Sequence, residues 1–222
     1  VAILPAVLLS DGPCVIENLP DISDVSTILK TMQSLGAQIR MINKSTVEID
    51  PRHVNSFVVS KKMAEGMRAS SYFLGALLGR MLRARVAPPG GCDFGVRPID
   101  QHIKGFEALG AKMTIENGMV DAKAMSLTGC LIYLDVVSVG ATINIMLAAA
   151  KADGLTIIEN AAREPHIVDL ANFLNSMGAN IMGAGTGVIK IRGVKHLNGT
   201  NYSIIPDQIE AGTYMAAAVA TR

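Results

Sequence analysis

A cysteine and an arginine share a short segment whose composition opposes regular secondary structure. Residues 88–100 contain three prolines and three glycines together with Cys92 and Arg97. Proline lacks an amide hydrogen and glycine is conformationally permissive, so we expect this segment to be a loop. Rigid scaffolds place reactive groups on loops, and a nearby cation favours the thiolate form of a cysteine. The segment is therefore either a reactive loop or a surface turn with an incidental cysteine.

The composition argues against several classes of function. The chain has 222 residues, a formal net charge of +1, 50% hydrophobic residues and 4% aromatic residues. A near-neutral chain with few aromatic rings is not expected to bind nucleic acid. No apolar stretch reaches the roughly 18 residues of a membrane span, so membrane insertion is not expected. Three cysteines indicate no disulfide framework and suggest a reducing compartment.

One short pattern ends three amphipathic stretches at intervals of about 70 residues. The pattern is Leu35-Gly36-Ala37, Leu109-Gly110-Ala111 and Met177-Gly178-Ala179. We expect each glycine to follow a helix in a left-handed conformation. After each glycine come two short apolar runs, and Asn117-Gly118 between one such pair is a strong hairpin signal. A third strand and a second helix complete each unit.

The repeat predicts a fold class and a domain organisation. Second helices are expected at residues 63–81, 139–150 and 209–220, and another helix at 1–10. Three units around an axis would bury these weakly charged helices against one another, which gives an α/β (α+β) fold. The first and last of these helices each lack a flanking unit. We therefore expect one three-unit domain at 1–206 and, at 207–222, the start of a crossing into a second domain.

Five segments carry long, ordered motifs. They are Pro89–His102, Met67–Ser70, Ser138–Thr142, Ile158–Pro165 and Pro206–Thr213. Through them the chain resembles, from end to end, one of the two similar domains of the UDP-N-acetylglucosamine 1-carboxyvinyltransferase family. The resemblance implies half of an inside-out α/β barrel and no metal or organic cofactor.

The resemblance also implies an activity and its reactive residues. Members of the family move the enolpyruvyl group of phosphoenolpyruvate to the 3′-hydroxyl of UDP-N-acetylglucosamine and release phosphate. This is the first committed step of peptidoglycan synthesis in the cytoplasm. Cys92 matches the family's general acid, which can form an adduct with phosphoenolpyruvate and is alkylated by fosfomycin. Arg97 matches a phosphate-binding arginine, and a guanidinium group suits bidentate oxyanion binding.

A larger set of residues matches the family's substrate-binding positions. Tyr72 stands where the family often has a tryptophan, and Val136 stands where some members carry a lysine. Without that lysine, backbone amides at a helix N-terminus and Ser138 are left to hold the diphosphate. The matched residues are Arg68, Tyr72, Arg97, Pro98, Ile99, Asp100, Gln101, His102, Val136, Val137, Ser138, Val139, Glu164 and Asp207.

Several of these residues have a structural alternative. Arg68 could form a salt bridge on a helix face, and His102 could be a buried hydrogen-bonding histidine. Ser138 and Asp207 could cap helices, and Glu164 could be a first-turn carboxylate.

The resemblance leaves two alternative functions open. The family's Lys-Asn pair and its second domain, with the expected base aspartate, have no counterpart here, so we expect no turnover from this chain alone. It could act as a non-catalytic nucleotide-sugar binding domain. It could also resemble 5-enolpyruvylshikimate-3-phosphate synthase, which shares the fold and the donor but lacks the cysteine loop and the Ser138–Thr142 motif.

Overall fold

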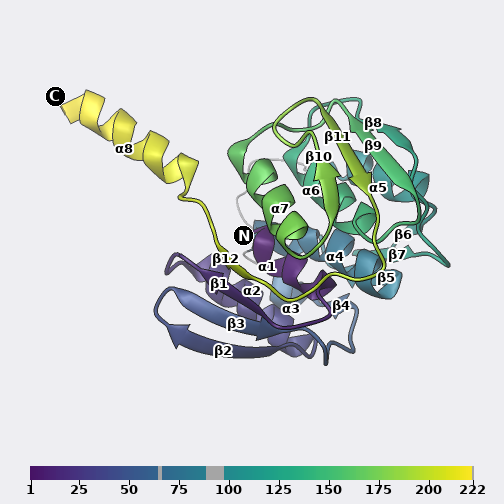
Figure 1. Ribbon diagram of the computed structural model, residues 1–222, viewed down its shortest axis with the longest axis horizontal. Coiled ribbons are helices and arrows are strands. Elements are labelled where there is room, and N and C mark those ends of the chain that lie inside the picture. The colour runs from purple at the N-terminus through teal and green to yellow at the C-terminus, as the bar shows by residue number, and fades with distance from the viewer. Residues whose placement is uncertain (65–66, 89–97, 222) are drawn as a thin grey trace.

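The computed structural model describes residues 1–64, 67–88 and 98–221. In this part of the chain the strands form three four-stranded sheets on the outside, and most helices lie between the sheets (Figure 1). Cys92 and Arg97 lie outside the described residues, and so does the side chain of Arg68.

The three sheets have the same strand order. They run β12-β1-β3-β2, β4-β5-β7-β6 and β8-β9-β11-β10, and in each the first pair is parallel and the other two are antiparallel. This common order confirms the threefold repeat. The strands are β1 (Cys14–Glu17), β2 (Gln38–Asn43), β3 (Thr46–Asp50), β4 (Val58–Val59), β5 (Arg83–Val86), β6 (Lys112–Glu116), β7 (Met119–Lys123), β8 (Leu131–Tyr133), β9 (Leu155–Glu159), β10 (Asn180–Met182), β11 (Val188–Arg192) and β12 (Asn201–Ser203).

Three equivalent helices lead into the three hairpins. They are α2 (Ser23–Ser34), α5 (Asp100–Ala108) and α7 (Pro165–Ser176). Gly36, Gly110 and Gly178 follow them with φ values of 108°, 98° and 103°, so the left-handed backbone expected after each helix is confirmed. The Asn117-Gly118 turn also has positive φ at both residues, as a tight hairpin turn requires.

A second set of helices forms the centre of the molecule. It comprises α1 (Ile3–Ala6), the 3-10 helix η1 (Val7–Leu9), α4 (Tyr72–Met81) and α6 (Val139–Ala149). Every residue of α1 and η1, and every residue of α6 from position 141 onward, is buried. The expectation that weakly charged helices pack against one another inside the sheets is therefore confirmed for these helices, but it is wrong for the helix expected at 209–220, which has no buried residue.

The expected continuous helix at 63–81 is wrong. The structure has a short helix α3 (Lys61–Ala64), a 3-10 turn η2 (Arg68–Ser71) and then α4. Met67 precedes η2 with an extended backbone, at φ −124° and ψ 115°, which no α-helix can contain. Arg68 and Tyr72 therefore lie on consecutive elements, not on one face of a single helix.

Strands from distant parts of the chain close the first sheet. β12 pairs in parallel with β1, and Val15 lies opposite Asn201. The hydroxyl of Tyr202 in β12 donates a 2.6 Å hydrogen bond to the buried carboxylate of Asp169 on α7. These contacts join the third unit to the first and complete a ring.

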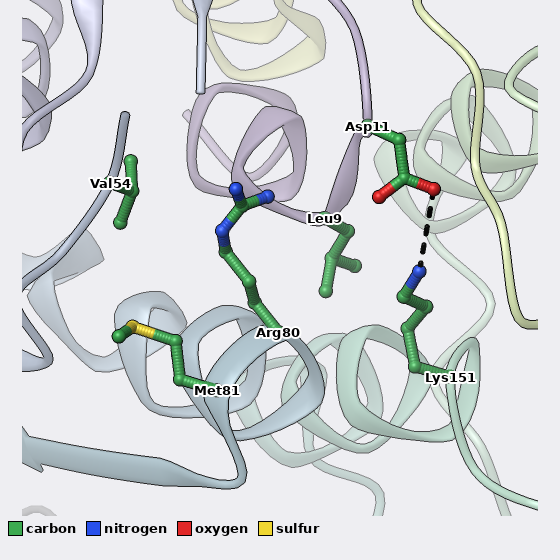
Figure 2. A pocket seen from close by; sticks show the side chains of 6 residues that line it. All are labelled: Leu9, Asp11, Val54, Arg80, Met81 and Lys151. Carbon is green, nitrogen blue, oxygen red and sulfur yellow. Dashed lines mark ion pairs between the residues drawn. The ribbon is translucent and has the colours of Figure 1, made fainter. Parts of the chain in front are cut away.

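The C-terminal ends of η1, α4 and α6 meet at a cavity of about 440 Å³ (Figure 2). Arg80 donates hydrogen bonds there to the carbonyl oxygens of Leu8, Ser10 and Pro51, at 2.7–2.9 Å. Cations stabilise helix C-termini, where carbonyl groups lack intrahelical partners. Asp11, Val54, Met81 and Lys151 complete the lining with Leu9, and Lys151 pairs with Asp11 at 3.9 Å. Arg80 and Lys151 therefore bind groups of the protein itself and hold neighbouring segments together at this cavity.

The last helix has a different environment. Helix α8 (Gln208–Thr221) has no buried residue and extends away from the rest of the molecule (Figure 1). Its role in a second domain stays a prediction. Among the described helices, none combines the length and apolar character that crossing a membrane requires.

Helices α4 and α6 approach each other more closely than side chains would allow. A Cβ atom on Gly75 would collide with the backbone carbonyl oxygen of Asn144, and one on Gly79 would lie 2.9 Å from that of Leu147. Gly75 faces Asn144 and, one turn later, Gly79 faces Leu147, so the two helices run parallel. Their N-termini therefore lie at the same end of the molecule.

We expect Gly75→Ala to lower the free energy of unfolding by about 3 kcal/mol, because the new methyl group must push two helix backbones apart. Urea unfolding followed by circular dichroism measures this loss. Gly212→Ala on the exposed helix α8 is the matched control, since a Cβ there meets nothing within 4 Å. Equal stabilities for the two variants would contradict the close α4–α6 contact.

Candidate functional site

The N-terminal ends of α5 and α6 meet at the end of the molecule opposite the cavity. His102 in the first turn of α5 lies against Gly140 in the first turn of α6, where its Nε2 atom would be 2.9 Å from a Cβ atom. The described end of the Pro89–His102 motif and the start of the Ser138–Thr142 motif are therefore neighbours in space. Two predicted groups of site residues are thus brought together.

The side chain of Gln101 fixes the segment that enters α6. It is 6% exposed, its amide oxygen accepts a 2.9 Å hydrogen bond from the backbone N–H of Asp135, and its amide nitrogen donates to the Asp135 carboxylate at 3.1 Å. Lys104 donates to the same carboxylate at 2.7 Å. The Lys104 hydrogen bond, followed by that of Gln101, lowers the pKa of Asp135. The side chain of Gln101 is thus occupied within the protein.

The first turn of α6 is partly exposed. Ser138 is the N-cap residue, and its hydroxyl accepts a hydrogen bond from the Ala141 N–H at 3.3 Å. First-turn amides have no intrahelical acceptor, so those of Val139 and Gly140 are available to an anion. Val136 and Val137 precede this turn and are 59% and 58% exposed. The capping alternative for Ser138 is confirmed, and it leaves room for an anion at the same turn.

His102 is buried and electrically neutral. It is 8% exposed, and burial lowers its pKa to about 4 although the nearby Asp100 carboxylate acts in the opposite direction. Its Nδ1 atom is buried and has no hydrogen-bond partner among the described residues. A neutral ring with one unsatisfied nitrogen can still form one hydrogen bond, to a ligand or to another part of the chain.

The remaining predicted residues occupy different positions around this site. Tyr72 begins α4 and packs against the core, and burial raises its pKa. Glu164 is the N-cap residue of α7 without a side-chain cap, and one of its oxygens is buried with no hydrogen-bond partner in the described chain. Asp207 accepts a hydrogen bond from the Ile209 N–H at 2.8 Å, as the capping alternative expects. Pro98 is exposed, and Ile99 packs against the core.

Sequence reasoning missed the polar contacts that hold the site in place. Asp135, Thr142 and Asn144 anchor the segment around the N-terminus of α6 through contacts with residues far away in the chain. The one available signal was the presence of a threonine and an asparagine inside an otherwise apolar helix. Among the described residues, no three His, Cys, Asp or Glu side chains are grouped so that they could hold a metal ion.

We expect the buried neutral His102 to make stability depend on pH. Because its folded-state pKa of about 4 lies below the ordinary histidine pKa of 6.5, the unfolded chain binds the extra proton first as the pH falls. The contribution of His102 to the free energy of unfolding is then present in full above pH 6.5. It falls as the pH decreases toward 4, with a loss of about 2 kcal/mol at pH 5.

Urea unfolding of the wild type and of His102→Gln at pH 7.5 and pH 5 tests this expectation. The variant should lose about 2 kcal/mol less than the wild type between the two pH values, because glutamine does not titrate. Parallel losses in both proteins would show that His102 is not a buried neutral histidine.

Comparisons with known proteins agree in sequence and in structure. The sequence matches the EPSP synthase (3-phosphoshikimate 1-carboxyvinyltransferase) family over residues 1–222. It is 61% identical over 221 residues to UDP-N-acetylglucosamine 1-carboxyvinyltransferase 3 of Caldanaerobacter subterraneus subsp. tengcongensis. It is 53% identical over 220 residues to UDP-N-acetylglucosamine 1-carboxyvinyltransferase 2 of Bacillus subtilis. The chain covers 53% and 51% of these relatives, so it spans about half their length.

Two solved structures have the same fold. The enolpyruvyl transferase NikO from Streptomyces tendae matches 97% of this chain with a TM-score of 0.84 at 24% identity, and the match covers 51% of that protein. EPSP synthase from Acinetobacter baumannii matches 96% of this chain with a TM-score of 0.74 at 19% identity, over 50% of its own length. The chain belongs to the EPSP synthase family. Along its whole length it is similar to about half the length of each of the two UDP-N-acetylglucosamine 1-carboxyvinyltransferases named above.

Proposed function

We propose that this chain is the half of an enolpyruvyl transferase that binds UDP-N-acetylglucosamine and supplies the reactive cysteine. The observation that carries the proposal is the convergence of the first turns of α5 and α6, fixed by the hydrogen bonds between Gln101 and Asp135. The free amides of Val139 and Gly140 offer a diphosphate the donors and the positive dipole end that anions favour. The named relatives supply the choice of nucleotide sugar.

In the proposed reaction the enolpyruvyl group moves from phosphoenolpyruvate to the 3′-hydroxyl of the sugar. An acid protonates the methylene carbon while the sugar oxygen, after losing its proton to a base, bonds to the adjacent carbon. The resulting tetrahedral ketal then loses phosphate and one proton to form the enol ether. Cys92 is proposed as the acid and Arg97 as a phosphate ligand, and neither role requires a metal ion.

The remaining roles follow the same proposal. Arg68 and Tyr72 would contact the nucleotide sugar, and residues 98–102 would lie along the uracil end through their backbone. Glu164 and Asp207 would face a second domain that completes the cleft. The reaction would be the first committed step of peptidoglycan synthesis, in the cytoplasm, and fosfomycin would alkylate Cys92.

A chimeric enzyme tests the proposed activity. We expect phosphate release when this chain replaces the matching half of the Bacillus subtilis enzyme and receives phosphoenolpyruvate with UDP-N-acetylglucosamine. Cys92→Ala in the chimera should lower turnover by about 100-fold or more, because a positioned acid contributes about that much. The unmodified Bacillus subtilis enzyme is the control.

Two outcomes would contradict this activity. Turnover with shikimate 3-phosphate in place of the nucleotide sugar would favour the alternative acceptor. A chimera that binds UDP-N-acetylglucosamine but releases no phosphate would indicate a non-catalytic binding domain.

We expect Val136→Lys to tighten the binding of UDP-N-acetylglucosamine about fivefold, because a cation beside the first turn of α6 attracts the diphosphate. Calorimetry on the 222-residue chain measures the gain, which should shrink as salt is added. Met182→Lys on β10 is the charge-matched control, since Met182 is 60% exposed and Val136 is 59% exposed. An equal gain in both variants would show that only net charge matters and that the diphosphate lies elsewhere.

A further inference from the structure

Two polar side chains interrupt the apolar interior of α6. Thr142 and Asn144 are both 0% exposed, and their neighbours along the helix are isoleucine, alanine, methionine and leucine. A buried polar group costs stability unless it is hydrogen-bonded, so apolar residues would be simpler choices for packing. The partners of the two side chains indicate what they do.

Thr142 connects the start of α6 with the segment that enters α7. Its hydroxyl donates a 2.8 Å hydrogen bond to the carbonyl oxygen of Ser138, the N-cap residue. The hydroxyl oxygen of Thr142 also accepts a 3.1 Å hydrogen bond from the buried backbone N–H of Ala162. Ala162 lies two residues before Glu164. One hydroxyl group therefore fixes two segments that the proposed function places beside the substrate.

Asn144 connects the start of α6 with α4. Its side-chain oxygen accepts a 2.9 Å hydrogen bond from the backbone N–H of Gly75, in α4. Its side-chain nitrogen donates a 2.9 Å hydrogen bond to the carbonyl oxygen of Gly140. Gly140 also lies against the ring of His102 on α5. The first turn of α6 is thus held from α4, from α5 and from the segment before α7.

We propose that Thr142 and Asn144 are positioning residues for nucleotide-sugar binding. They touch no solvent and so cannot be ligands, but they fix the first turn of α6 before a ligand arrives. A preformed turn saves the ordering cost that a mobile one would add to binding. The inference rests on the proposed function, because it concerns the amides of Val139 and Gly140 that we assign to the diphosphate.

A purely structural role makes a different prediction. Buried hydrogen bonds that only stabilise the fold would change the unfolding temperature and leave the affinity of folded molecules unchanged. Positioning bonds must change the affinity as well, and a conservative replacement that keeps the hydroxyl group must restore it. Thr142 allows this distinction because valine keeps its shape and serine keeps its hydroxyl.

The experiment is calorimetry with UDP-N-acetylglucosamine on the 222-residue chain. We expect Thr142→Val to raise the Kd roughly tenfold, because that change in Kd corresponds to the net contribution of one hydrogen bond. Thr142→Ser should stay within about threefold of the wild type, and Asn144→Leu should weaken binding like the valine variant. Leu147→Ala is the control, since this buried residue lies in the C-terminal half of α6. It should lower the unfolding temperature without changing the Kd.

Hydrogen exchange separates this inference from the proposed function. In the absence of ligand, the amides of Ala141 and Ala162, which donate to the hydroxyl groups of Ser138 and Thr142, should exchange faster in Thr142→Val than in Leu147→Ala. Equal exchange rates in the two variants, or an unchanged Kd in Thr142→Val, would overturn the positioning role. A wild-type chain that does not bind the nucleotide sugar would overturn the proposed function, and the exchange rates would still decide whether Thr142 fixes the first turn of α6.

Discussion

The close approach of α4 and α6 is the constraint on which the rest of the molecule depends. Glycine at positions 75 and 79 lets the two backbones touch, and the parallel contact places both helix N-termini at one end. Such close packing has two consequences. It removes the space in which side chains could adjust, and it brings first-turn amides and carbonyls within reach of single side chains such as Asn144. The position of the first turn of α6 at the candidate site therefore depends on the packing of α4 against α6 in the core.

The two ends of the central helices have opposite electrostatic character. At the C-terminal end, carbonyl groups of buried residues are met by the protein's own cations, and Arg80 alone binds the carbonyl oxygens of Leu8, Ser10 and Pro51. At the N-terminal end, the protein provides the Ser138 hydroxyl as a cap but places no cation of its own at Val136 or Val137. Helix ends need partners of opposite charge. The cavity end is thus satisfied internally, whereas the α6 N-terminus is left suited to an anionic ligand.

The sequence predicted the parts of this fold that depend on local chemistry. Gly36, Gly110 and Gly178 marked the helix ends because only a residue without a side chain adopts a left-handed backbone easily. Asn117-Gly118 marked a hairpin for the same reason. The pairing of β1 with β12 was not predicted, because it depends on contacts between distant segments. The break at Met67 was not predicted either. The candidate site follows the same division: the Pro89–His102 and Ser138–Thr142 motifs were found, but not the hydrogen bonds between Gln101 and Asp135 that join the two segments.

Buried polar groups in α6 indicate which property this helix was selected for. If stability alone mattered, valine and leucine at positions 142 and 144 would pack without the cost of desolvating a hydroxyl and an amide. Hydrogen bonds differ from apolar contacts because they require one direction and one distance. Thr142 and Asn144 therefore fix the position of the first turn of α6. The isoleucine and leucine side chains bury the helix in the core but do not fix that position. A helix whose N-terminus must meet a ligand requires a fixed position, and a helix that only fills a core does not.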